Sequence, residues 1–185
     1  MAPTISKTVK LIEVQDLRLH PLPFDLHWTA GKDTSALAGV PEVTGELRFQ
    51  GTARLAGEGM RLQGHLHADI APACARCLEP ITMDVDRDFD LLYQPESVIG
   101  ESAEVEIHPA DAEVGFFAGP GVDIEEVARE QVLLALPMQP LCRPDCRGLC
   151  PRCGANLNAG ACACPPVGDD RWSALKTLRQ PGPKI

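Results

Sequence analysis

Eight cysteines, spaced as metal ligands, constrain this chain more than any other feature of its sequence. A first pair stands in the letters CARC, and six more follow in LCRPDCRGLCPRCGANLNAGACAC. A C-x-x-C turn can place two sulfurs on one tetrahedral ion, and in CPRCG a glycine follows the second cysteine, as in zinc-ribbon turns. The sequence therefore predicts zinc ligands at Cys74, Cys77, Cys142, Cys146, Cys150, Cys153, Cys162 and Cys164.

The predicted compartment favours metal over disulfides. The N-terminal letters MAPTISKTVK lack the apolar core of a signal peptide, and no apolar run approaches the length of a transmembrane helix. We therefore expect a cytoplasmic protein without membrane contact, in which thiols stay reduced.

Two divisions of the cysteines into four-sulfur sites are open. In the favoured division, one site takes Cys150, Cys153, Cys162 and Cys164, and the other takes Cys74, Cys77, Cys142 and Cys146. The alternative division places Cys142, Cys146, Cys150 and Cys153 on one ion. An iron–sulfur cluster accepts the same ligands, and Cys74 with Cys77 could be a redox pair, but the knuckle letters favour zinc. Two structural zinc ions would use all eight sulfurs and leave no open position for catalysis.

Charge is unevenly distributed along the chain. Residues 1–141 hold 10 Lys and Arg against 23 Asp and Glu, a net charge of −13, whereas residues 142–185 hold 7 against 3, a net charge of +4. The acidic total argues against a general nucleic-acid coat. Four arginines inside or beside the cysteine turns are candidate contacts to RNA phosphate or to an acidic protein face: Arg76, Arg143, Arg147 and Arg152. The same arginines could instead only offset the charge of thiolate clusters.

Apolar and polar residues alternate in the first half of the chain, which is typical of antiparallel strands with one buried face. The alternation predicts strands over 43–55, 60–70 and 81–91, with a turn at 57–59. The last two strands flank the first cysteine pair, so we expect a hairpin that carries Cys74 and Cys77.

Other segments give weaker signals. Pro21 and Pro23 should break any long element near the N-terminus, and residues 94–121 resemble a surface loop with a short strand at Glu104–His108. Asp123 and Glu126 form a capping pair that opens a helix, which Pro137 ends. A short last helix could begin at Asp169 or Asp170.

These elements predict an α+β protein: an antiparallel β-sheet, which could close into a barrel, one long helix, and a small cysteine-rich zinc lobe at the C-terminus. We expect residues 1–141 to form an acidic body and residues 142–185 to form the zinc lobe and the terminal helix.

Polar residues on the predicted strands suggest a solvated face more than a site. His65 and His67 fall on the polar side, and the carboxylates Asp84, Asp86, Asp88 and Asp90 follow on the next strand. Such carboxylates can bind a hard cation, but a regular repeat more often faces solvent. No nucleophile triad, phosphate loop or HExxH helix is present, so we expect neither an enzyme nor a small-molecule substrate.

The combined motifs resemble one family. The CARCL turn, the letters LALP at the helix end, the run CRPDCRGLCPRCGANLN with its C-x-C close, and the terminal RWSALKTL are similar to the YceD-like proteins, the large ribosomal RNA subunit accumulation proteins. The resemblance implies a bacterial cytoplasmic factor in ribosome biogenesis that supports synthesis, processing or stability of 23S rRNA. Its partner would be ribosomal RNA or a large-subunit ribosomal protein. An adaptor whose acidic body binds a basic ribosomal protein without RNA contact is the alternative.

Overall fold

A six-stranded open sheet forms the body of the protein. The structure, a computed structural model, describes residues 5–6, 10–31, 37–98 and 114–165. Its elements are β1 (Ile5–Ser6), β2 (Leu11–Glu13), α1 (Val14–Leu17), β3 (Leu22–Thr29), β4 (Glu42–Ala56), β5 (Gly59–Ala71), β6 (Met83–Pro95), η2 (Glu96–Val98), β7 (Val114–Phe117), β8 (Gly121–Asp123) and α2 (Ile124–Ala135). The sheet order is β1-β3-β4-β5-β6-β7, and β2 pairs with β8 separately.

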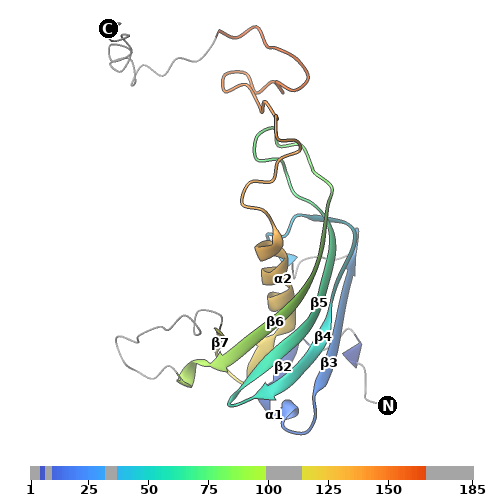
Figure 1. Ribbon diagram of the computed structural model, residues 1–185, viewed down its shortest axis with the longest axis vertical. Coiled ribbons are helices and arrows are strands. Elements are labelled where there is room, and N and C mark those ends of the chain that lie inside the picture. The colour runs from blue at the N-terminus through green and yellow to red at the C-terminus, as the bar shows by residue number, and fades with distance from the viewer. Residues whose placement is uncertain (1–4, 7–9, 32–36, 99–113, 166–185) are drawn as a thin grey trace, which may run out of the picture.

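The molecule is elongated, with the cysteines beyond one end of the sheet. Figure 1 shows the sheet as a tall curved layer with α2 beside it, and residues 142–164, here called the cysteine lobe, extending past the β5–β6 hairpin. The hairpin is continuous from Met60 opposite Tyr93 to Ile70 opposite Met83. The first cysteine pair therefore lies where the sequence predicts it, at the far end of two long antiparallel strands.

Alternation along β5 produces the buried face of the sheet. Met60, Leu62, Leu66, Ala68 and Ile70 are fully buried, while Arg61, Gln63, His65, His67 and Asp69 alternate with them on the other face. A bulge interrupts the pairing of β4 with β5 between Val43 and Leu47. The three long strands are thus confirmed close to their predicted bounds.

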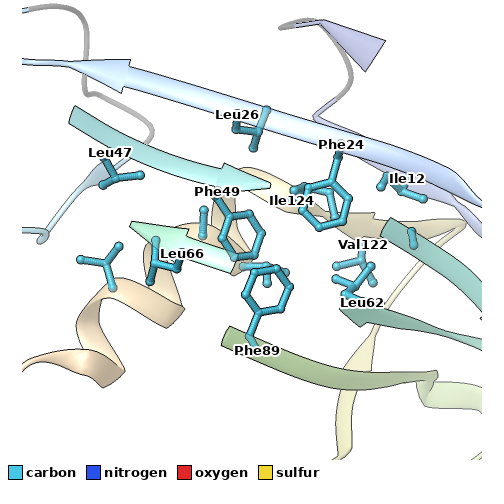
Figure 2. Close-up of a cluster of buried hydrophobic side chains, with 14 of the residues drawn as sticks. Ile12, Phe24, Leu26, Leu47, Phe49, Leu62, Leu66, Phe89, Val122 and Ile124 are labelled. Atoms are coloured by element: carbon cyan, nitrogen blue, oxygen red, sulfur yellow. The ribbon is translucent and has the colours of Figure 1, made fainter. Parts of the chain in front are cut away.

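Three phenyl rings stack in the centre of the core. Phe49 lies 4.4 Å from Phe89 and 5.4 Å from Phe24 between ring centroids, and Figure 2 shows the three side chains together beside Ile124. Gly51 faces Gly64 across β4 and β5. A Cβ on either glycine would lie under 3 Å from a ring atom of Phe24 or Phe89. The glycine pair makes the room that the rings occupy.

Helix α2 begins at the predicted cap. The Asp123 carboxylate accepts hydrogen bonds from the N–H groups of Glu125 and Glu126, which satisfies two of the free donors at the helix start. The helix buries Ile124, Val127, Ala128, Gln131 and Val132. It is 12 residues long, an ordinary length, so the long helix is not confirmed.

The structure corrects three other predictions. The sheet is no closed barrel, because β1 and β7 form its two edges among the described residues, and it is mixed, since β1–β3 and β6–β7 are parallel pairs. Strand β3 runs through Pro23; a proline is tolerated near a strand start, and β1 pairs with only two residues of β3. Strand β7 lies within the predicted loop 94–121, and β8 begins at its last residue. The predicted strand at Glu104–His108 and the terminal helix lie outside the described residues.

Two candidate metal centres

Backbone hydrogen bonds shape the turn around Cys74 and Cys77. The N–H of Cys74 donates to the Glu79 carbonyl at 2.8 Å, and the N–H of Leu78 donates back to the Cys74 carbonyl at 2.9 Å. Leu78 has a φ of +62°, in the left-handed region that favours glycine. This conformation reverses the chain directly after the second cysteine.

The turn around Cys150 and Cys153 repeats the same pattern. The N–H of Cys150 donates to the Ala155 carbonyl at 2.8 Å, and the N–H of Gly154 donates to the Cys150 carbonyl at 2.9 Å. Gly154 has a φ of +71°, at the position that Leu78 holds in the first turn. Equivalent antiparallel bridges close both turns, Ala73 with Pro80 and Leu149 with Asn156. The chain therefore carries two knuckles of one local shape.

The first centre joins the hairpin to the cysteine lobe. Its four sulfurs, from Cys74, Cys77, Cys142 and Cys146, lie within 4.8 Å of one another. The Sγ atoms of Cys74 and Cys146 are 3.8 Å apart, and those of Cys77 and Cys142 are 3.7 Å apart. A disulfide would require about 2 Å. Two sulfurs on one tetrahedral zinc are separated by about 3.8 Å, because each zinc–sulfur bond is about 2.3 Å.

The cysteines of the first centre differ in pKa because their hydrogen bonds and burial differ. Backbone N–H groups of Cys77 and Cys142 lower the pKa of Cys74 to about 6; the Cys142 N–H lies 3.4 Å from the Cys74 sulfur. Burial and the neighbouring sulfurs raise the pKa of Cys142 to about 12. Without a cation, four thiolates this close repel one another, so only some of them can ionise.

The second centre lies within the cysteine lobe. The sulfurs of Cys150, Cys153, Cys162 and Cys164 also lie within 4.8 Å of one another. The N–H groups of Cys153 and Arg152 lower the pKa of Cys150 to about 6. The Cys153 sulfur and burial raise the pKa of Cys164 to about 12. The structure thus brings the cysteines together in the favoured division and not in the alternative one.

The residues present fit a single divalent ion in each centre. Four sulfurs, with the tetrahedral spacing measured in the first centre, match the donor set that zinc takes in structural sites. The cysteines of a four-iron cluster bind separate irons and must lie further apart. An ion in each centre would favour ionisation of all four of its thiols and supply a cross-link between segments distant in sequence.

The four candidate arginines divide into two kinds. Arg76 donates from Nη1 to the carbonyl of Cys146 at 2.8 Å, and Arg143 donates to the Asn158 side chain at 2.8 Å. Both therefore brace the first centre. The side chains of Arg147 and Arg152 are exposed and have no hydrogen bond or ion pair with any described residue. These two are available to a partner.

Asn158 is a residue of the first centre that the sequence reasoning missed. Its Nδ2 donates to the Cys146 sulfur at 3.3 Å, and this bond lowers the pKa of Cys146. The letters GANLN after the second knuckle contain it, but cysteine spacing alone cannot assign an asparagine to a centre formed by other segments.

The outer face of β5 and β6 carries cross-strand ion pairs. His65 lies 2.9 Å from Asp88 and 3.3 Å from Asp86, and these carboxylates raise the pKa of His65. His67, Asp69 and Asp84 group more loosely, at 3.6 to 3.8 Å, with partly or fully exposed side chains. The contacts agree with a solvated face whose charges pair between strands.

A hollow of about 720 Å³ opens between β7 and α2. Three exposed apolar side chains line it, Leu11, Phe116 and Leu134. Glu126 and Glu130 line it as well. Burial, together with these carboxylates, raises the pKa of Tyr93 within the hollow to about 12. The hollow is thus apolar, and among its charged lining residues three carboxylates, Asp123, Glu126 and Glu130, outnumber one cation, Arg129.

Fold and centres together define a class: a small sheet protein with two cysteine knuckles, the first of which lies at the end of the long β5–β6 hairpin. No described helix is long and apolar enough to span a bilayer. The family model of the large ribosomal RNA subunit accumulation protein YceD matches residues 62–179, which include all eight cysteines and more than half of the chain. The chain belongs to this family, as its motifs indicate.

Relatives occur in bacteria and in a plant plastid. An uncharacterized protein of Mycobacterium tuberculosis is 34% identical over 125 residues, which cover 67% of this chain and 58% of the relative. The large ribosomal RNA subunit accumulation protein YCED homolog 1, chloroplastic, of Zea mays is 29% identical over 140 residues, covering 63% of this chain and 48% of the relative. The chain therefore spans about half the length of these curated relatives. No solved structure matches it.

Proposed function

We propose that this protein is a non-enzymatic, cytoplasmic ribosome-biogenesis factor that supports the synthesis, processing or stability of 23S rRNA. The observation that carries the proposal is the family match, which includes both cysteine centres. The maize relative is named for accumulation of large-subunit ribosomal RNA.

Zinc has a structural role in this proposal. Each centre offers four sulfurs, which fill a tetrahedral shell and leave no ligand position for a reacting water. Binding of structural zinc contributes on the order of 10 kcal/mol to folding of small lobes. The cysteine lobe has few buried apolar residues of its own, so the ions would supply most of its order.

Arg147 and Arg152 are the proposed contacts to RNA phosphate. Their side chains are exposed and lack partners among the described residues, and both arginines belong to the basic end of the chain. Arginine binds phosphate through a planar, bidentate guanidinium. Arg76 and Arg143 would act indirectly, by holding the first centre in shape.

The test replaces the chromosomal gene with the Arg147→Glu/Arg152→Glu variant. We expect a lower ratio of 23S to 16S rRNA and loss of co-sedimentation with large-subunit particles, because charge reversal repels phosphate. The matched control is Arg54→Glu, an exposed arginine on β4 far from the cysteines in sequence. Normal rRNA levels and co-sedimentation in a variant that retains its zinc would overturn the RNA contact.

The acidic hollow favours a second candidate, an adaptor for a basic ribosomal protein. Exposed apolar side chains that converge in one hollow mark interaction sites, and the carboxylates of Glu126 and Glu130 suit a basic amphipathic segment. An adaptor would keep its partner from purified large subunits after nuclease treatment and lose it in Phe116→Ser/Leu134→Ser. Leu55→Ser, at an exposed leucine outside the hollow, is the control. Release of all partners by nuclease would reject the adaptor.

A further inference from the structure

We propose that Asn158 couples the two cysteine centres, so that an ion held in the second centre strengthens ion binding in the first. This coupling rests on the metal binding proposed above. It concerns a side chain that ligates neither ion.

Both ends of the Asn158 side-chain amide make hydrogen bonds at the first centre. Its Nδ2 donates to the Cys146 sulfur at 3.3 Å. Its Oδ1 accepts from the N–H of Arg147 and from Nη2 of Arg143, both at 2.8 Å. One side chain therefore binds the ligand sulfur, the backbone next to it and an arginine on the preceding turn. Such contacts fix the direction in which the sulfur presents its lone pairs.

Asn158 nevertheless belongs to the second centre by its place in the chain. It lies between Cys153 and Cys162, and both contribute sulfurs to that centre. Within the same segment, the N–H of Leu157 donates to the Gly148 carbonyl at 2.9 Å. An ion in the second centre would anchor both ends of residues 154–161 and so hold Asn158 against Cys146.

Asn156 extends the connection to the hairpin. Its Oδ1 accepts from the N–H of Asn158 at 2.9 Å, and its Nδ2 donates to a carboxylate oxygen of Glu79 at 2.8 Å. The segment therefore contacts both parts of the chain that form the first centre. The position of this segment depends on ion binding in the second centre, and it determines the contact between Asn158 and Cys146 in the first centre.

The expected size follows from the chemistry of outer-shell partners. Loss of a group that orients a metal ligand typically lowers metal affinity by about 10- to 100-fold. An empty second centre would release the segment and remove this contact. Coupling between binding sites is reciprocal, so an empty first centre should weaken the second by the same factor.

The experiment is a double-mutant cycle on the full chain. The variants are Asn158→Ala, Cys150→Ser/Cys153→Ser, and the triple combination. Each is equilibrated with zinc against a graded competing chelator. Free thiols are then alkylated, and mass spectrometry resolves the protection of each cysteine. We expect each of the first two variants to weaken zinc binding by Cys74, Cys77, Cys142 and Cys146 about 10- to 100-fold, and the triple variant to weaken it no further.

Ala159→Ser, a neighbouring exposed position, is the control and should match the wild type. If Cys150→Ser/Cys153→Ser prevents folding of the lobe, Asn158→Asp in the otherwise intact chain replaces it. The carboxylate cannot donate to the thiolate and repels it, so the first centre should weaken, and because the coupling is reciprocal the second centre should weaken with it. A second centre that keeps its wild-type affinity for zinc in this variant would overturn the coupling.

The outcomes separate the coupling from the metal proposal. The coupling would be overturned if Cys150→Ser/Cys153→Ser left the zinc affinity of the first centre unchanged. It would also be overturned if the fold-losses of the two variants multiplied in the triple variant. Either result would leave two independent zinc sites. A wild-type chain that binds no zinc would overturn metal binding itself, and the coupling with it.

Discussion

Leu78 and Gly154 hold equivalent positions in two knuckles of the same shape, and only one of them is glycine. Both have left-handed backbone, with φ of +62° and +71°. A side chain in this region costs roughly 1–2 kcal/mol. The first knuckle tolerates that cost at the end of a long hairpin, where Leu78 is 65% exposed. The second knuckle is not supported by long strands, and it has glycine at this position, which adopts left-handed backbone without the steric cost.

We therefore expect Gly154→Ala to weaken zinc binding at the second centre by about fivefold, the equivalent of about 1 kcal/mol of backbone strain. A Cβ at Gly154 would meet no atom within 4 Å, so the effect would be conformational. Chelator competition with site-resolved alkylation measures it. Leu78→Gly removes the corresponding strain and should not weaken the first centre. Unchanged second-centre affinity in Gly154→Ala would contradict the strain argument.

His65 should make stability depend on pH. Asp88 and Asp86 raise the pKa of His65 in the folded protein, so the folded chain holds this proton more tightly than the unfolded chain does. The stabilisation is complete below the ordinary histidine pKa of about 6.5 and is lost as pH rises through the folded-state pKa. His65→Gln should therefore lower the free energy of unfolding in mildly acidic buffer and change little in alkaline buffer. Urea titrations at both pH values test this, and a difference independent of pH would argue against the pairing.

Among the elements, those with long regular patterns were predictable. Apolar and polar residues alternate along strands β4, β5 and β6, which are 13 to 15 residues long. The capping residue Asp123 marks the start of α2. The short strands β7 and β8 were not predictable, because three or four residues beside glycines and prolines carry no periodicity. The cysteine grouping followed from spacing, since the ligands of one ion must be brought together by turns. The role of Asn158 did not follow from spacing, because it depends on how the segment between Cys153 and Cys162 packs against Cys146.

Gly64→Ala should destabilise the sheet through its core. A Cβ there would lie 2.8 Å from the Phe89 ring and 2.6 Å from the Cα of Gly51, and would overlap the Gln50 carbonyl. Overpacking of this kind costs about 1–3 kcal/mol. Urea unfolding of Gly64→Ala against Gly160→Ala measures it, because a Cβ at Gly160 would meet nothing within 4 Å. Equal stability of the two variants would contradict the packing of the phenyl rings.

For the whole molecule, two separate apolar clusters imply two levels of stability. The sheet and α2 share one large core, whereas Cys74, Cys77 and Cys146 form a small cluster with Ile81, Leu141 and Leu149. The large core does not include the cysteine lobe. The order of the cysteine lobe therefore depends on the proposed ions more than on burial of apolar side chains.

Chelation of zinc should accordingly unfold only one end of the protein. We expect fast amide exchange throughout residues 142–164 and in the knuckle at 72–81 after chelator treatment, while β4 and β5 stay protected. Hydrogen–deuterium exchange with peptide resolution provides the measurement, and re-addition of zinc is the control. Collapse of protection across the whole sheet would show that the two clusters are not independent.

The first centre also has a topological consequence. Cys77 and Cys142 are 65 positions apart in the chain, and β6, β7, β8 and α2 all lie between them. An ion that binds both cysteines would make this stretch a closed ring, which supplies strands β6 and β7 to one edge of the sheet. A single backbone cut within the ring would then open it without separating the two fragments. The cut alone would leave Cys77 and Cys142 linked through the ion, and release of the ion would remove that link.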